Sequence, residues 1–190
     1  DDPMKLLRKT IAAAAALLAT TAFADVNIGV TLSLTGPASG LGIPVGNQFK
    51  LWPQTIAGEK VNLIILDDAS DPGKGVNNAR RFVTDDKVDM IFGGSITPVT
   101  AAVAPVSTES KTPLIALSPI ATPPSGQEWA FPVPQPTPVM MEAVVEHMKT
   151  QNVKTVAFIG FNDSWGDLVF KGFSAMADPA GISVVANERY

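Results

Sequence analysis

Six short apolar runs, rich in β-branched residues, alternate with segments of helical pattern along this chain of 190 residues. The runs cover residues 26–32, 61–66, 88–92, 114–117, 153–159 and 182–185. The run at 61–66 is almost uniformly apolar, which is typical of a parallel strand covered on both faces. Strand, crossover helix and strand in repeated succession predict an α/β fold, in which a parallel sheet carries helices on both faces.

Acidic residues stand where N-caps are expected before two of the helical segments. Asp71 is followed by Pro72, a pair that predicts the start of a helix ending near residue 84. Asp163 predicts the cap of a second helix, which ends near residue 177. A helix over about 98–110 is expected to be bent or interrupted at Pro105, because proline cannot donate to the helical ladder.

The first 24 residues have the pattern of a secretory signal peptide. Met4 precedes three basic residues, an apolar run follows at 11–19, and Ala22-Phe23-Ala24 predicts cleavage after Ala24. Residues 1–3 precede this natural start methionine and are interpreted as leader residues. The alternative, a membrane anchor, is disfavoured because the apolar run is far shorter than the ~20 residues that span a bilayer.

A proline-rich segment divides the remaining chain. Seven of the 16 prolines lie between residues 119 and 138, a stretch that suits neither an ordinary helix nor a central strand. We interpret it as a crossover between two units, with four predicted strands before it and two after it. The predicted organisation is a leader at 1–24, an incomplete N-terminal lobe at 25–132 and the truncated start of a second lobe at 133–190.

Composition excludes several classes of site. The chain has no cysteine and one histidine, His147, which excludes disulfides, thiolate metal sites and histidine metal clusters. A net charge of −4 argues against general nucleic-acid binding. His147 lies within a predicted helix and is interpreted as solvated, so we predict no catalytic residue, no metal and no cofactor. Asp67, Asp68 and Asp71 suggest either a cation site or, as we favour, a turn followed by a helix cap.

Four loops rich in small hydroxyl residues and glycine follow the predicted strands, at 33–42, 93–98, 118–122 and 161–166. They contain no Lys, Arg or His, and Asp163 is the only ionisable residue among them. In open α/β sheets, ligands bind where such loops enter helix N-termini. Hydroxyl and N–H groups, which carry no formal charge themselves, can bind an anion there. This predicts reversible capture of a carboxylate.

Four longer motifs, in this order and spacing, resemble the branched-chain amino-acid binding proteins. These are the periplasmic solute-binding subunits of ABC importers, which have a two-lobed type I periplasmic binding fold. The likeness covers nearly all of residues 25–190. The motifs are IGVTLSLTGPASGLG (28–42), LIILDDASDPGKGVNNARRFV (63–83), IFGGSITPVTAAVAPVSTESKTPLIALSPIAT (91–122) and VAFIGFNDSWG (156–166).

The resemblance implies a ligand site between two lobes. The first lobe would hold the ligand carboxylate through Thr97 and Thr122, each by its hydroxyl, and through the backbone of Ile120. The neighbouring residues Ser95, Ile96 and Ala121 would line the same loops. For Thr97, the plain alternative is a helix N-cap before Pro98, and the two roles are compatible.

Two further positions carry over from the family pattern. Trp165 stands where an aromatic ring of the second lobe usually covers the ligand, although it could equally be a core or hinge-packing residue. Leu41 stands where another aromatic residue often lies in amino-acid-binding members. This departure leaves room for amides or aromatic acids as ligands.

The resemblance also implies a mechanism and partners. A monomeric protein would close by a hinge around a small-molecule solute and dock on the ABC permease subunits in the periplasm, with no covalent chemistry. Family members are roughly twice as long, so this chain alone is expected to bind weakly or not at all. A sensor or receptor ectodomain of the same fold and a secreted α/β enzyme remain as alternatives.

Overall fold

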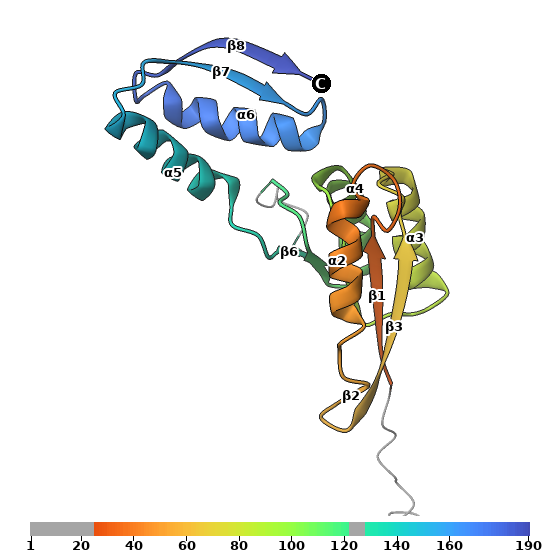
Figure 1. Ribbon diagram of the computed structural model, residues 1–190. Helices are drawn as coiled ribbons and strands as arrows, with labels where there is room; N and C mark the ends of the chain where they lie inside the picture. The colour runs from red at the N-terminus through yellow and green to blue at the C-terminus, as the bar shows by residue number, and fades with distance from the viewer. Residues whose placement is uncertain (1–24, 122–127) are drawn as a thin grey trace, which may run out of the picture.

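The computed structural model describes residues 25–121 and 128–190 (Figure 1). The predicted signal peptide and Thr122 lie outside the described residues. The chain forms a six-stranded sheet in the order β2-β3-β1-β4-β5-β6 and a two-stranded sheet of β7 and β8. The strands are β1 (Val26–Leu32), β2 (Thr55–Ile56), β3 (Glu59–Asp67), β4 (Met90–Gly93), β5 (Leu114–Ala116), β6 (Ala130–Pro132), β7 (Thr155–Gly160) and β8 (Ser183–Arg189).

The strand pairing confirms the predicted parallel α/β fold. All pairs are parallel except the short β2–β3 pair, which is antiparallel. Between these strands run the helices α2 (Ser39–Phe49), α3 (Pro72–Thr84), α4 (Thr97–Ser110), α5 (Thr137–Thr150) and α6 (Ser164–Ala177). The alternation of strand and helix along the chain therefore produces the crossovers that the sequence predicts.

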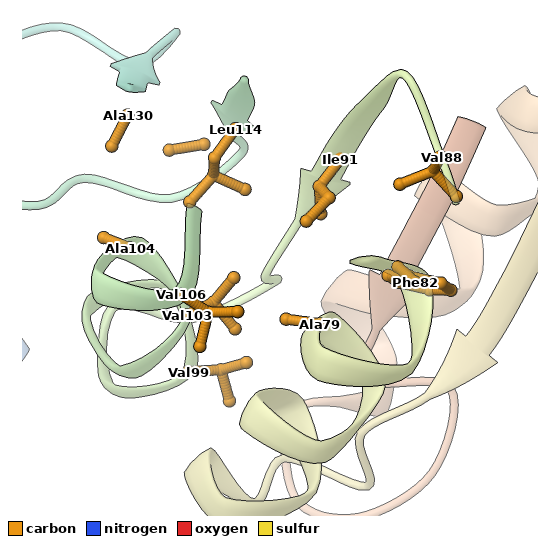
Figure 2. Close-up of a cluster of buried hydrophobic side chains, with 11 residues drawn as sticks. Ala79, Phe82, Val88, Ile91, Val99, Val103, Ala104, Val106, Leu114 and Ala130 are labelled. Carbon is orange, nitrogen blue, oxygen red and sulfur yellow. The ribbon is translucent and has the colours of Figure 1, made fainter. Parts of the chain in front are cut away.

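Two buried clusters cover the two faces of the first sheet. On one face, Phe49 of α2 packs with the side chains of β1 that alternate toward it, among them Val30 and Leu32. On the other face, α3 and α4 pack over Ile91 and Leu114. Figure 2 shows this second cluster, with Val99 and Val103 of α4 facing Ala79 of α3.

The second sheet is smaller and is covered on one face. Val145 of α5, Phe173 of α6 and Ile182 form its buried cluster, and Figure 1 shows α5 and α6 on the same side of β7 and β8. On the opposite face, Ile159 and Val185 are 72% and 67% exposed. The predicted helical cover on both faces is thus present in the first sheet only, within the part of the chain that the structure describes.

Both predicted acidic caps are confirmed. Asp71 Oδ1 accepts a hydrogen bond of 2.7 Å from the N–H of Lys74, in the first turn of α3. Asp163 Oδ1 accepts bonds of 2.9 Å from the N–H groups of Trp165 and Gly166, in the first turn of α6. Each side chain satisfies N–H groups that have no acceptor within the helix.

Two expectations about helix and loop bounds are wrong. The helix α4 is not interrupted at Pro105 and continues to Ser110, and its residues Val103, Ala104 and Val106 lie in the buried core on both sides of the proline. The predicted loop at 33–42 ends early, since α2 begins at Ser39. A Cβ at Gly42 would collide with the carbonyl oxygen of Ser33, so the backbone of α2 at Gly42 contacts the backbone of Ser33 directly.

Among residues 25–121 and 128–190, no helix combines the length and apolar character required to cross a membrane.

Candidate functional site

Three loops meet where β1, β4 and β5 end. These strands are parallel neighbours, so their carboxyl ends lie along the same edge of the first sheet. The N–H of Ser33 donates to Ser95 Oγ over 3.0 Å, which joins the first loop to the second. Thr97 Oγ1 donates to the carbonyl oxygen of Pro119 over 2.6 Å, which joins the second loop to the third. We call this region, residues 33–35, 94–97 and 117–121, the loop edge.

Ser95 and Thr97 use their hydroxyl groups differently. The oxygen of Ser95 accepts from Ser33, so its own proton remains free to donate, and the residue is half-buried. Thr97 is buried, and its hydroxyl proton is directed to Pro119. The Ser95 hydroxyl proton is therefore free and that of Thr97 is engaged; the donor role that sequence reasoning assigned to Thr97 stays a prediction.

Thr97 is the first residue of α4 and not its N-cap. Ile96 holds the N-cap position, with extended backbone angles and no side-chain cap. The alternative interpretation of Thr97 as a plain N-cap is therefore wrong. The first N–H groups of a helix have no acceptor within the helix, so the start of α4 offers the N–H of Thr97 beside the Ser95 hydroxyl, whereas the next residue, Pro98, has no N–H.

The apolar residues predicted for the site are partly exposed. Ile96 and Ile120 pack against the core between α3 and α4 and remain half-buried. Ala121 is exposed, and the next predicted residue, Thr122, lies outside the described residues. Leu41, on the first turn of α2, is 59% exposed. The loop edge thus combines hydroxyl and N–H donors with apolar side chains.

Trp165 lies in α6, which covers the second sheet. It is half-buried in the first turn of this helix, two residues after the cap Asp163. Figure 1 shows this end of α6 above the edge toward which the arrowheads of β1 and β3 point, and α4 and α6 lie next to each other. The fold therefore brings the helix that carries Trp165 to the helix that begins at Thr97.

Buried hydroxyl groups behind the loop edge were given no role by sequence reasoning. Thr100 Oγ1 accepts from the N–H of Gly94 over 2.9 Å and is hydrogen-bonded to Ser118 Oγ. Both hydroxyl residues are almost completely buried. They tie the second loop to the third from inside the molecule. The sequence could have indicated Thr100, because this residue lies one helical turn after Ile96 and therefore faces the same loop.

Asp67 and Asp68 hold the first loop, as the favoured turn interpretation predicts. Asp68 is fully buried and accepts from Ser33 Oγ at 2.7 Å, Thr31 Oγ1 at 3.2 Å and the N–H of Ser70 at 2.9 Å. Asp67 accepts from the N–H groups of Leu34, Thr35 and Ala69 and from the Thr35 hydroxyl. In the described part of the chain, no group of three or more acidic, histidine or cysteine residues could hold a metal ion.

The hydrogen bonds to Asp67 predict a pH-dependent contribution to stability. Partial burial, the largest single effect, raises the pKa of Asp67, but the bonds from Thr35, Ala69 and Leu34 together lower it below its ordinary 3.8. A lowered pKa in the folded state stabilises the chain above about pH 4, and this stabilisation is lost as the pH falls through the folded-state pKa.

We therefore expect Asp67→Asn to reduce the free energy of unfolding by about 1 kcal/mol at neutral pH, and by less at about pH 3. Urea unfolding of both chains at the two pH values measures the difference. Asp85→Asn, at the C-terminal end of α3, serves as the control for removal of one carboxylate. A difference that grows on acidification would contradict the assignment.

An apolar hollow beside the second sheet lies apart from these residues. It has a volume of about 260 Å³ and is almost entirely apolar. It is lined by Met141, Val144, Met148, Val156, Ala157, Phe158, Val169 and Phe173. None of the predicted ligand residues lines this hollow, so it is not the site that the sequence predicts.

Comparisons with known proteins point to one family. A family model described as periplasmic binding protein matches residues 25–190. Leu/Ile/Val-binding protein homolog 3 of Brucella melitensis is 32% identical, with 96% of this chain and 52% of the relative covered. Leu/Ile/Val-binding protein BraC3 of Rhizobium johnstonii is 30% identical, with 97% and 52% covered.

A solved structure agrees with these relatives. The extracellular ligand-binding receptor of Rhodopseudomonas palustris HaA2 is 42% identical and superposes with a TM-score of 0.84, covering 88% of this chain and 47% of that one. The chain thus spans about half the length of the proteins it matches. These relatives are named as binding proteins or receptors, not as enzymes.

Proposed function

This chain belongs to the periplasmic binding protein family, and we propose that it supplies the carboxylate-binding wall of an extracytoplasmic solute-binding subunit of an ABC importer. The observation that carries the proposal is the junction of three loops at the loop edge, through Ser33–Ser95 and Thr97–Pro119. This junction places a free hydroxyl proton and the start of a helix at the same point, where uncharged donors suit a small carboxylate.

The proposed binding mode follows from the donors that remain free. Ser95 donates its hydroxyl proton to one carboxylate oxygen, and the N–H groups at the start of α4 donate to the other. Thr97 keeps the second and third loops together through Pro119 and contributes its N–H. Thr122 contributes a further hydroxyl, as the family resemblance suggests, and the backbone of Ile120 contributes beside it.

Apolar residues surround the body of the ligand in this proposal. The loops after β4 and β5 provide Ile96, Ile120 and Ala121, and α2 provides Leu41. Trp165 of α6 covers the ligand from the other side, as an aromatic ring suits an apolar or aromatic body. This composition fits a branched-chain amino acid and equally an aromatic acid. Binding is reversible and needs no catalytic residue or cofactor.

The remaining parts of the proposal concern the whole protein. Residues 1–24 direct the chain to the periplasm, residues 25–132 form the first lobe and residues 133–190 begin the second. The two lobes close around the solute by a hinge, and the monomeric complex docks on the permease subunits. The names of the Leu/Ile/Val-binding relatives support a role in solute capture.

Saturation-transfer difference NMR on this chain tests the proposal, because the method detects weak association. Benzoate and L-leucine are compared with benzamide and leucinamide, which lack the carboxylate. We expect saturation transfer to the two acids and little to the two amides. Equal transfer to an acid and its amide, or none to either acid, would refute carboxylate capture by this chain on its own.

We expect Ser95→Ala to weaken the binding of benzoate about tenfold, because a hydrogen bond to a charged oxygen is lost. Titration of the saturation-transfer signal measures the dissociation constants. Ser110→Ala is the matched control, since Ser110 ends the same helix and bonds to the carbonyl oxygen of Val106 within it. An unchanged dissociation constant in Ser95→Ala would show that Ser95 does not bind the ligand.

A further inference from the structure

We propose that Arg189 is a positioning residue, which fixes the first turn of α6, where Trp165 lies. Arg189 ends β8, beside the loop that follows β7, and its side chain is 20% exposed. The proposal concerns the orientation of this loop and of the first turn of α6. Only its consequence for ligand binding rests on the proposed function.

The guanidinium group connects three elements by directed polar contacts. Its Nη1 donates to the carbonyl oxygen of Phe161 over 2.9 Å, in the loop after β7. Its Nη2 lies 3.3 Å from Asp167 Oδ1, in the first turn of α6. Its Nε donates to Asn187 Oδ1 of β8 over 3.1 Å. A planar guanidinium group with several N–H donors can contact all three acceptors at once, whereas the single ammonium of lysine cannot contact them with the same geometry.

Two aromatic rings hold the guanidinium in place. Its central carbon lies 5.2 Å from the ring centre of Phe158 in β7 and 5.5 Å from that of Phe170 in α6. The two rings are themselves in contact, with centres 5.0 Å apart. Cation–π contacts of this kind restrict the side chain and add to the polar contacts. Arg189 is therefore packed between the strand and the helix.

Gly166 brings the start of α6 directly against this group. A Cβ at Gly166 would lie 2.5 Å from Arg189 Nη1 and would collide with the carbonyl oxygen of Phe161. Trp165 immediately precedes Gly166, and Asp163 accepts from the N–H groups of both. The position of the Trp165 backbone is thus fixed by Asp163 at the cap and by Arg189 behind the first turn.

The strand pairing around Arg189 does not depend on its side chain. The N–H of Tyr190 donates to the carbonyl oxygen of Gly160 over 3.1 Å, and the N–H of Asn162 donates to that of Tyr190 over 3.0 Å. These backbone bonds remain when the side chain is replaced. We therefore expect variants of Arg189 to keep the β7–β8 pair and to change the loop and the first turn of α6.

Acrylamide quenching of Trp165 fluorescence tests the proposal in the 190-residue chain. Trp52 and Trp129 are replaced by phenylalanine, so that Trp165 is the only reporter. In this parent, Arg189→Met is expected to raise the quenching constant of Trp165 at least twofold, and Arg189→Lys to raise it nearly as much. The control Arg80→Met removes an exposed ion pair between α3 and Glu109 of α4 and should leave the constant unchanged.

A second variant, Gly166→Ala, changes the surface of α6 that contacts Arg189. Gly166→Ala should raise the quenching constant as well, because its Cβ would collide with both the Phe161 carbonyl oxygen and Arg189 Nη1. A quenching constant that both arginine variants leave unchanged while circular dichroism shows a folded chain would overturn the proposal. Should Arg189→Met fail to fold, Arg189→Lys decides between the same two outcomes.

The consequence for the ligand is measured separately. If benzoate binds the parent chain, Arg189→Met should weaken that binding severalfold, as Trp165 loses its orientation. If benzoate does not bind the parent while Trp165 becomes more accessible in Arg189→Met, the proposed function fails and the positioning role stands. If benzoate binds and the accessibility does not change, the positioning role fails and the proposed function stands.

Discussion

Alanine in place of Phe82 is expected to lower the free energy of unfolding by about 3–5 kcal/mol. Phe82 has no exposed surface, and Figure 2 shows it as a member of the buried cluster on one face of the first sheet. Three of its ring atoms lie 2.5–2.9 Å from the place that a Cβ of Gly29 would occupy. Because β1 presents only glycine backbone there, no side chain of that strand can fill the cavity.

Urea unfolding followed by the fluorescence of Trp52, with Trp129 and Trp165 replaced by phenylalanine, measures this loss, since Trp52 packs against Phe49 of α2 and Phe92 of β4. Phe131→Ala is the matched control, because Phe131 lies in the edge strand β6 and is 50% exposed. We expect the control to cost less than about 1 kcal/mol. Similar losses in the two variants would mean that Phe82 is not a core residue.

Removal of the Asp68 carboxylate is expected to have the second largest effect. Asp68→Ala leaves the hydroxyl groups of Thr31 and Ser33 and the N–H of Ser70 without their buried acceptor, which should cost about 2–4 kcal/mol. Asp68→Asn should cost less than half of that. The bonds from Ser33 and Ser70 both end on Oδ1, which the amide retains.

The same unfolding measurement compares Asp68→Ala with Asp71→Ala. Asp71 is a neighbouring carboxylate that caps α3, and losing a cap costs about 1 kcal/mol. The Asp68 variant should also weaken benzoate binding, because Asp68 holds Ser33, whose N–H orients Ser95. If Asp68→Ala is no more destabilising than Asp71→Ala, the buried hydrogen bonds to Asp68 do not stabilise the first loop.

Local interactions explain which parts of the fold could be predicted. Asp71 and Asp163 cap their helices through groups two or three residues away, so the sequence alone identifies both helix starts. The helix α2 depends on distant contacts instead. It contains Pro44 and three glycines, and Gly42 packs on the backbone of Ser33. Its sequence pattern is that of a loop, and tertiary packing makes it a helix.

The same distinction applies to the candidate site. The loops could be located, because parallel strands end at one edge of the sheet. The hydroxyl that remains free to donate could not be identified, because Ser95 and Thr97 look equivalent in the sequence. Their difference comes from Ser33, 62 residues from Ser95, and from Pro119, 22 residues from Thr97.

The most direct test of carboxylate capture at the loop edge is an amide chemical-shift titration of the ¹⁵N-labelled chain with benzoate. We predict saturable shifts for the N–H groups of Ser95, Ile96, Thr97 and Ile120, and none for the same groups when benzamide is added. Shifts confined to the apolar hollow that α5, β7 and α6 line, or equal shifts with benzamide, would contradict carboxylate capture at the loop edge.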